Sequence, residues 1–369
     1  MQSKPFGKRT KLEINPVSIG GMRLPEDVID SVKLIRHAID SGLKYIDTSR
    51  GYGDSEFKLG RAMRDGYRQK VYLSSKCSPW IKKVQETDDG SADSMRRRIE
   101  ETMVRLDTDY MDFYQVWNID SPKAWETATK KGGMVDGIKK AMDEGIVRHT
   151  GFTTHDKPEN IVKYLDDADW CEVILVSYNM SNRDYEPVLA KAKEVGIGTI
   201  VMNPVGGGKF AQESPVLQKI VDQIGAVSIP DLAVRYVLSN PNVDTILCGI
   251  SKLTDPDHTI ASAQRRPFSD EQINEINEYF ESIKPVNFNF CTGCRYCVPC
   301  PQGIEIPGIM NSLYLDRFLQ LKESAVHDYN WSTRQVSPKL CTECGQCEEK
   351  CTQKLPIIQL LKEALERFN

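Results

Sequence analysis

Short apolar runs alternate along most of the chain with longer segments whose apolar residues recur every three or four positions. Bounded runs of this length are typical of buried strands, and the longer period is typical of amphipathic helices. The runs interpreted as strands are Val17–Gly20, Lys44–Asp47, Val71–Lys76, Met111–Val116, Val147–Gly151, Val173–Ser177, Thr199–Met202 and Thr245–Leu247. Helical periods include Ser91–Leu106, Pro187–Val195 and Pro230–Leu238. Eight strand-then-helix units over about 260 residues predict an α/β fold, an eight-stranded parallel (β/α)8 TIM barrel.

An open doubly wound sheet is the alternative architecture. The first predicted strand ends in Gly20-Gly21, which is not the G-x-G-x-x-G fingerprint of a dinucleotide fold. The barrel is therefore favoured. Gly206, Gly207 and Gly208 follow the seventh strand, where a triple glycine either lets backbone approach a phosphate or forms a flexible loop.

The pattern changes after the last barrel helix, which is predicted over Asp270–Ser282. That helix runs out at Lys284-Pro285, and a cysteine-rich tail follows. We predict a barrel domain over residues 1–284 and a small, mainly helical ferredoxin-like domain over residues 285–369. The tail carries two helical stripes, Met310, Leu313, Tyr314, Phe318 and Leu321, then Ile357, Leu360, Leu361, Ala364, Leu365 and Phe368. We expect both stripes to be structural and to shield the cysteines.

Two cysteine runs carry the strongest chemical signal. They are Cys291, Cys294, Cys297 and Cys300, followed by Pro301, and Cys341, Cys344, Cys347 and Cys351. Three thiolates two residues apart can wrap one iron–sulfur cubane, and in two-cluster ferredoxins the fourth ligand comes from the other run. That pattern assigns Cys291, Cys294, Cys297 and Cys351 to one 4Fe-4S cluster, and Cys341, Cys344, Cys347 and Cys300 to the second. The tail resembles a bacterial-type two-cluster ferredoxin segment, with Thr352 where such runs usually carry proline.

Other uses of these cysteines are weaker. Two zinc sites are the alternative, because paired Cys-x-x-Cys steps also suit tetrahedral zinc. The third cysteine at the same spacing and Pro301 favour iron and sulfide. Disulfides are disfavoured, because no leader with a basic start and an apolar core precedes Lys8 and a chain this long needs no staples. Cys77, Cys171 and Cys248 lie in apolar stretches and should be reduced and buried.

Charge and hydropathy narrow the class of protein further. The net charge is −4 with both signs interspersed, so there is no footprint for nucleic acid or an anionic membrane. No apolar run approaches the roughly 20 residues that span a bilayer. We expect a cytoplasmic protein, and oxygen-sensitive clusters suggest an anaerobic or low-oxygen setting.

Polar and aromatic residues mark the carboxyl ends of three strands, where catalysis in such barrels takes place. The second strand ends at Asp47, Tyr52 follows in the next loop, the third ends at Lys76 and the fourth at Trp117. A cation near a phenol lowers the pKa of a tyrosine from about 10 toward the working pH. Tyr52 is then a usable general acid for a carbonyl oxygen. The structural alternative is a rim ion pair of Asp47 and Lys76 beside a rim aromatic.

Six short sequence motifs extend this interpretation. They are Ile-Gly-Gly-Met-Arg-Leu24, Ile-Asp-Thr-Ser-Arg-Gly-Tyr-Gly53 with Ser55-Glu56, Ser-Ser-Lys76, Asp-Tyr-Met-Asp-Phe-Tyr-Gln115, Arg-His-Thr-Gly-Phe152 and Met-Asn-Pro-Val-Gly-Gly-Gly208. In these motifs the chain resembles the aldo-keto reductases over nearly the whole barrel, and more narrowly the branch with a ferredoxin tail. The resemblance implies that Tyr52 is the proton donor, that Lys76 tunes it and that Asp47 holds the lysine.

Several positions depart from the family pattern. Trp117 takes the place of the family's catalytic histidine, and an indole offers one N–H donor and no base. His155 is the nearest histidine that could stand in, with a solvated loop position as its alternative. Thr153-Thr154 replaces the Ser-Asn pair that holds the nicotinamide carboxamide, and Leu175 replaces a glutamine. His258-Thr259 stands where a Glu-Asn pair grips adenine.

NADPH remains a candidate cofactor because of positions that keep a suitable residue type. By the resemblance, the cofactor-binding candidates are Gly21, Met22, Thr153, Asn179, Gly249, Ser251 and Lys252. Among these, Ser251 and Lys252 are of residue types that can bind a phosphate group of the cofactor. They are the main reason to retain NADPH.

Three functions compete, and the family resemblance slightly favours the first. The first is an oxidoreductase that reduces a carbonyl or an activated double bond, with Tyr52 as acid, NADPH as hydride source and clusters passing single electrons. The second dispenses with NADPH and receives electrons through the tail from a partner ferredoxin or flavoprotein. The third is a non-catalytic electron carrier, which the retention of Asp47, Tyr52 and Lys76 argues against. Because Trp117 adds bulk and a flat face, we expect a planar or conjugated small-molecule substrate.

Overall fold

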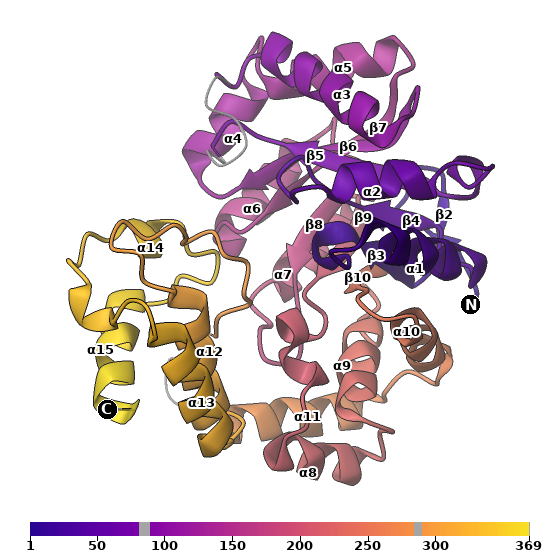
Figure 1. The fold of residues 1–369 in the computed structure, drawn as a ribbon. Coiled ribbons are helices and arrows are strands. Elements are labelled where there is room, and N and C mark those ends of the chain that lie inside the picture. The colour runs from indigo at the N-terminus through magenta and orange to yellow at the C-terminus, as the bar shows by residue number, and fades with distance from the viewer. Residues whose placement is uncertain (81–88, 284–289, 369) are drawn as a thin grey trace. The chain divides into compact units, whose positions relative to one another are not determined.

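The computed structural model describes residues 1–80, 89–283 and 290–368 (Figure 1). These residues group into two compact units. The first comprises Met1–Tyr178, Arg183–Pro204 and Val234–Pro267, and the second comprises Asn179–Asn182, Val205–Ala233 and Phe268–Asn369. The predicted domain boundary at Lys284-Pro285 lies outside the described residues.

Eight parallel strands close into a barrel in the first unit. Their order is β10-β3-β4-β5-β6-β7-β8-β9, with each strand hydrogen-bonded to the next and β9 to β10. The bounds are β3 Val17–Gly20, β4 Tyr45–Asp47, β5 Tyr72–Cys77, β6 Met111–Ile119, β7 Val147–Thr154, β8 Val173–Ser177, β9 Gly198–Met202 and β10 Thr245–Gly249. All eight predicted strands are present, and the (β/α)8 fold class is confirmed.

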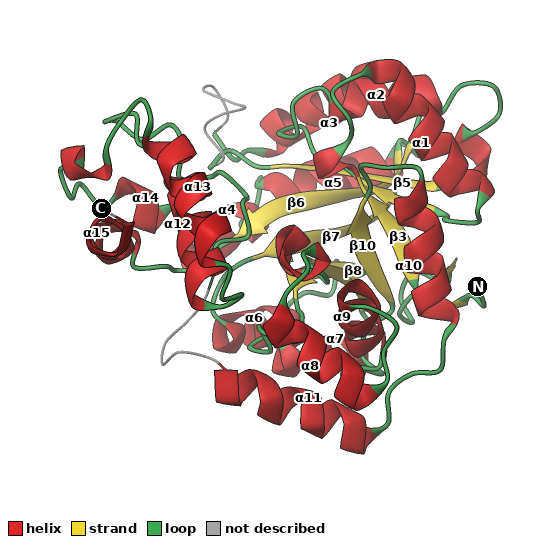
Figure 2. Cartoon of the chain, turned by 60° about the horizontal axis from the view of Figure 1, so that its bottom comes forward, coloured by secondary structure: helices red, strands yellow, loops and turns green. Residues whose placement is uncertain are grey.

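Helices of the first unit lie along the outside of these strands, as Figure 2 shows for α1, α2, α3 and α5. They are η1 Gly21–Arg23, α1 Val28–Asp40, α2 Ser55–Ala62, η2 Arg68–Lys70, α3 Ala92–Leu106, α4 Pro122–Thr129, α5 Met134–Asp143, α6 Pro158–Asp166, α7 Glu186–Glu194 and α10 Thr254–Gln264. Helix α9, Ile229–Leu238, is divided between the two units. Serine caps set two of the starts, because the hydroxyls of Ser91 and Ser121 accept backbone N–H groups of α3 and α4.

The barrel interior is filled by side chains from strands β4, β6, β8, β9 and β10. Tyr45, Phe113, Val173, Leu175, Ile200 and Leu247 form one buried cluster with Phe6 and Ile14. Phe6 and Ile14 belong to the N-terminal segment, whose strands β1 Lys4–Pro5 and β2 Glu13–Ile14 pair antiparallel. The polar start of the chain did not predict this hairpin. Leu175 therefore has a packing role inside the barrel.

Strands β6 and β7 each run three residues further than the sequence predicted. Strand β6 continues through Trp117 to Ile119, and β7 continues to Thr154. Their register shifts between Val116 and Ile119, and Asn118 has a φ of 56°. This irregularity has the character of a β-bulge, a feature that often re-aims side chains next to active sites.

The second unit contains the cysteine tail and additional helices. These are η3 Gly206–Ala211, α8 Pro215–Ile224, α11 Asp270–Ile283, α12 Ile306–Arg317, α13 Lys322–Thr333, η4 Pro338–Leu340, α14 Gln346–Glu349 and α15 Ile357–Phe368. Met310 and Leu313 of α12 share a buried cluster with Ile357 and Leu361 of α15, and five of the tail cysteines pack against that cluster. The predicted shielding of the cysteines by both helices is confirmed.

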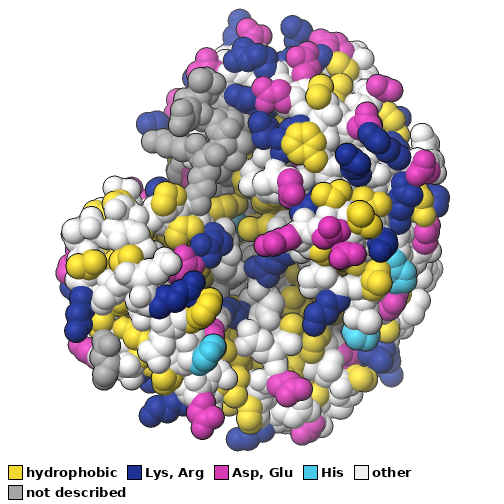
Figure 3. Space-filling model, in the orientation of Figure 1, with side chains coloured by type: hydrophobic (Ala, Val, Ile, Leu, Met, Phe, Trp, Pro, Cys, Tyr) yellow, Lys and Arg dark blue, Asp and Glu magenta, His cyan; other side chains and the backbone are white. Residues whose placement is uncertain are grey.

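On the face shown in Figure 3, basic and acidic side chains are interspersed, which agrees with the near-balanced composition. Among the described helices, none is both long enough and apolar enough to cross a membrane.

Candidate active site and cysteine cavities

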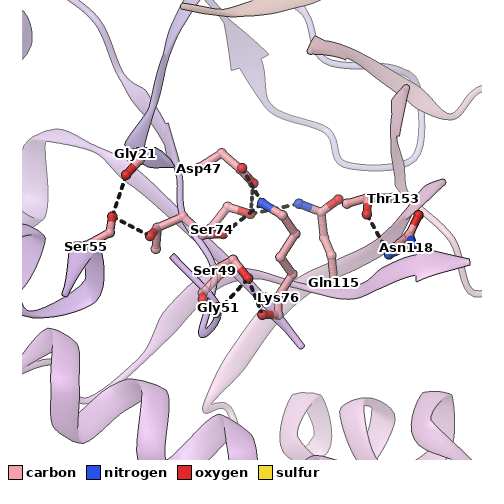
Figure 4. A network of polar contacts seen from close by, with 12 residues as sticks. Gly21, Asp47, Ser49, Gly51, Ser55, Ser74, Lys76, Gln115, Asn118 and Thr153 are labelled. Atoms are coloured by element: carbon pink, nitrogen blue, oxygen red, sulfur yellow. Dashed lines mark hydrogen bonds and ion pairs between the residues drawn. The ribbon is translucent and has the colours of Figure 1, made fainter. Parts of the chain in front are cut away.

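A buried ion pair lies at the carboxyl ends of β4 and β5. Asp47 closes β4, and Lys76 is on the neighbouring strand two residues beyond the register partner of Asp47. The exposed fractions are 2 % for Asp47 and 1 % for Lys76. The Lys76 Nζ pairs with Asp47 Oδ2 and donates to the carbonyl oxygen of Thr48 at 2.8 Å (Figure 4).

Burial acts on both members of this pair against their charged forms. It raises the pKa of Asp47 and lowers the pKa of Lys76, while the attraction between the two charges opposes both shifts. The attraction between the two groups is what favours their charged forms in this nearly dry part of the barrel, where charge–charge interactions are stronger than in water.

Two further side chains support Asp47. The Gln115 Nε2 donates to Ser74 Oγ at 2.9 Å, and Ser74 Oγ makes a long 3.5 Å contact with Asp47 Oδ1 (Figure 4). Three adjacent strands therefore contribute to one polar chain. The sequence named Ser74 and Gln115 only as parts of family motifs, but their spacing two residues before Lys76 and Trp117 signals a shared inward face.

Tyr52 and Trp117 complete the constellation predicted at the barrel mouth. The Lys76 Nζ lies 5.0 Å from the centroid of the half-buried Tyr52 ring. The Tyr52 and Trp117 rings meet edge to face, with centroids 5.6 Å apart and planes at 84°. The structure thus brings Asp47, Tyr52, Lys76 and Trp117 together.

The loop that carries Tyr52 is fastened to β5. The backbone N–H of Arg50 and the hydroxyl of Ser49 both donate to the carbonyl oxygen of Lys76, at 3.3 and 3.2 Å. The Tyr52 N–H donates to the carbonyl oxygen of Ser49 at 3.0 Å. The same strand therefore positions both the lysine and the phenol.

The bulge on β6 positions Trp117, which is only 4 % exposed. Its carbonyl oxygen accepts the Trp80 Nε1–H at 3.0 Å, and the carbonyl oxygen of Asn118 accepts the same N–H at 2.6 Å. The Asn118 N–H donates to Thr153 Oγ1 at 2.8 Å. Thr153, proposed from the sequence for a cofactor contact, thus has a hydroxyl oxygen that already supports the bulge.

The remaining candidates for cofactor contacts differ in their surroundings. Gly21 permits a close approach between loops, because a Cβ atom there would lie 3.0 Å from the carbonyl oxygen of Asp47 and 2.9 Å from Ser55 Oγ. Met22 and Gly249 are exposed. Asn179 is buried, and its Oδ1 accepts the backbone N–H groups of Ser181 and Asn182 within its own turn.

The expected phosphate grip is already occupied by a side chain. The Asp255 Oδ2 accepts the backbone N–H groups of Ser251 and Lys252 at 2.7 and 2.8 Å, and the Ser251 hydroxyl at 3.1 Å. These donors are therefore bound by a side chain in the first turn of α10. His155, the candidate substitute for the missing histidine, is half-buried just after β7.

Two cavities in the second unit are lined by cysteines from both runs. One is lined by Cys291, Cys294, Cys297 and Cys351. The other is lined by Cys300, Cys341, Cys344 and Cys347, together with Cys297. Each cavity thus draws cysteines from both runs.

The two cavities differ in exposure. Cys351 is buried at one, whereas Cys344 is exposed at the other. Burial raises the pKa of Cys291 to about 11 and that of Cys297 to about 12, so these thiols need a metal charge to become thiolates at neutral pH. Within residues 1–80, 89–283 and 290–368, no three or more His, Cys, Asp or Glu side chains lie close enough together to hold a single metal ion.

The sequence matches the aldo/keto reductase family over residues 16–281 and a 4Fe-4S dicluster domain over residues 290–356. The chain belongs to the aldo/keto reductase family, is an oxidoreductase, and carries an iron–sulfur dicluster domain after its barrel.

Relatives of known sequence or structure support the assignment of the barrel. L-galactose dehydrogenase of Arabidopsis thaliana is 24 % identical over 306 residues, which cover 74 % of this chain and 93 % of that protein. An aldo-keto reductase from Bacillus halodurans superposes on this chain with a TM-score of 0.67 at 21 % sequence identity. The superposition covers 76 % of this chain and 96 % of the Bacillus chain. A thermostable aldo-keto reductase in complex with the inhibitor epalrestat gives 0.62 at 22 % identity, covering 76 % of this chain and 100 % of its own. At these identities the two structures support the fold alone.

Proposed function

We propose that this protein is an iron–sulfur reductase that acts on a carbonyl or an activated double bond, with Tyr52 as the proton donor. The observation that carries the proposal is the contact between the buried Asp47–Lys76 pair and the Tyr52 ring at the barrel mouth. A structural ion pair alone would have no need of a half-buried phenol beside its cation.

Each residue at the barrel mouth has a separate role in the proposed reaction. Lys76 favours the phenolate that Tyr52 becomes when it gives up its proton, and Asp47 keeps the lysine charged and in place. Trp117 borders the phenol with an apolar face. A flat conjugated substrate would stack there better than a sugar. Solvent would return the proton to Tyr52 after each turnover.

We further propose that two 4Fe-4S clusters occupy the two cysteine cavities with crossed fourth ligands. Cys291, Cys294, Cys297 and Cys351 would hold one cluster, and Cys341, Cys344, Cys347 and Cys300 the other. The lining of the cavities supports this assignment. When bound, the clusters would supply one electron each, and the reduction of one carbonyl or double bond takes two electrons and two protons, of which Tyr52 would give one and solvent the other.

The source of those electrons has two candidates. A partner ferredoxin or flavoprotein is favoured, because Asp255 occupies backbone donors of the phosphate grip and Leu175 is committed to the barrel core. NADPH is the second candidate. The exposed Lys252 side chain and the open space beside Gly249 favour it.

One anaerobic experiment tests the proposal. Purified protein should contain about eight iron and eight sulfide per chain, and its brown colour should bleach with dithionite. Titration with NADPH then separates the electron sources, because a partner-fed enzyme should neither bleach nor retain the nucleotide. Stoichiometric zinc in place of iron would overturn the cluster assignment.

A further inference from the structure

Within the second unit, the glycine-rich turn η3 packs on both sides of Cys291. Gly207 has a φ of 69°, and a Cβ atom there would lie 2.5 Å from the carbonyl oxygen of Thr292, the residue after Cys291. Phe210 is fully buried and meets the ring of Phe290, the residue before Cys291, edge to face at 5.9 Å. The turn is therefore fixed against the first cysteine run.

Between Gly207 and Phe210, this turn buries a lysine. Lys209 is only 7 % exposed, and its Nζ lies 4.8 Å from the centroid of the Tyr314 ring on α12. Tyr314 is fully buried and stacks on Phe318, with ring centroids 5.3 Å apart. An aromatic face therefore covers the cation where water would cover a surface lysine, and the field of its charge is weakly screened.

The charge of Lys209 reaches the first cysteine run. The Tyr314 ring that its Nζ faces also meets the ring of Phe290, the residue before Cys291, with ring centroids 4.9 Å apart. The mechanism proposed above makes no use of this lysine.

We propose that Lys209 raises the reduction potential of the cluster held at Cys291 and thereby directs electrons toward it. The proposal rests on the cluster assignment given under the proposed function. A cluster gains one negative charge on reduction, so a fixed cation beside it stabilises the reduced form more than the oxidised form.

The second cluster has no comparable environment among the described residues that flank it. Its ligand Cys344 is exposed, and Lys339 and Lys350, the lysines next to its run, are exposed as well. Solvent and salt screen such charges. Burial by itself favours the less charged, oxidised form of a cluster, so the proposal requires the Lys209 charge to outweigh the burial of the cluster at Cys291. One electron then passes from the exposed cluster, which is oxidised, to the cluster at Cys291, which is reduced.

The test is a potentiometric titration of the anaerobic holoprotein, followed by electron paramagnetic resonance. Cys294→Ser and Cys344→Ser identify which signal belongs to which cluster. Lys209→Met should shift the cluster at Cys291 to a more negative potential by about tenfold in its reduction equilibrium constant, which is 59 mV for a one-electron couple. Lys209→Arg should restore most of the potential, and the exposed control Lys339→Met should change neither cluster.

Three outcomes would overturn the inference. They are no shift in Lys209→Met, an equal shift of both clusters, and a wild-type cluster at Cys291 with the lower potential of the two. The comparison of the two potentials in the wild-type protein tests the inference even if Lys209→Met fails to assemble its clusters. Iron and sulfide analysis distinguishes the failures, because a wild-type protein without two clusters overturns the proposed function itself.

Discussion

Replacing Lys76 with methionine should abolish the acid function of the barrel and leave the tail intact. The Lys76 Nζ lies 5.0 Å from the Tyr52 ring centroid. At an effective dielectric constant of about 20, a unit charge at that distance favours the phenolate by about 3 kcal/mol. If the transition state receives all of this, the loss is about a hundredfold in rate, at the low end of the 10²-fold to 10⁴-fold range for a lost general acid.

The same substitution leaves Asp47 buried without its cation. Breaking a buried pair in this way costs about 3–5 kcal/mol of stability, so loss of turnover alone would be ambiguous. The double variant Asp47→Asn/Lys76→Met removes both charges and is the matched control. It should regain most of the lost stability but remain as inactive as Lys76→Met.

The direction of the pKa shift at Asp47 adds a pH test. Burial raises the pKa of Asp47 in the folded chain, and Lys76 opposes that rise. A carboxyl with a raised folded-state pKa binds more protons when folded than when unfolded, so stability falls as the pH rises through that window. Lys76→Met should therefore be more destabilised at pH 8 than at pH 5.5, and the double variant should not show this difference.

Two assays are needed for this comparison. Thermal unfolding followed by circular dichroism reports stability, and reoxidation of reduced clusters by a conjugated carbonyl compound reports activity. If the double variant regains activity together with stability, Lys76 acts only in folding, and the acid role of Tyr52 loses its physical basis.

Three other substitutions test separate parts of the account. Cys300→Ser should damage the cluster of Cys341, Cys344 and Cys347 and spare the cluster of its own run, which iron analysis with resonance spectra would show. Trp117→His should raise NADPH-dependent reduction of simple aldehydes, and a wild-type rate of roughly 1 to 10³ per second on such aldehydes would contradict a diverted pocket. Gly207→Ala should destabilise the second unit by more than the roughly 1–2 kcal/mol of a positive φ, because its Cβ would meet the Thr292 carbonyl. Gly225→Ala, with a φ of 72° and open space, is the control for melting measurements.

Much of the barrel was predictable because its strands are buried on both faces. Strand β8, for example, is apolar from Val173 to Val176, and it has the predicted bounds Val173–Ser177. The N-terminal hairpin was not predicted, because its paired strands contain only two residues each. The bulge that carries Trp117 was also missed, since a register shift between β6 and β7 depends on pairing and leaves no periodic signal.

The candidate sites were predictable to different degrees. The spacing of the cysteines indicated the set around each cavity, because short loops around a cubane impose local spacing. The positions of Asp47, Tyr52 and Lys76 followed from strand ends. In contrast, residue type does not reveal the hydrogen bonds that Ser251 and Lys252 donate to Asp255, or the burial of Lys209.

The most direct measurement follows electrons from the clusters to a substrate. Anaerobic protein is reduced with dithionite, freed of excess reductant and mixed with an aryl enone in the absence of NADPH. The account predicts that both clusters reoxidise, that one substrate molecule is reduced for every two electrons, and that Tyr52→Phe slows this reaction but leaves reoxidation by ferricyanide unchanged. The account would be contradicted if the clusters stay reduced when conjugated carbonyl compounds are added, while the same protein reduces those compounds with NADPH as the only reductant.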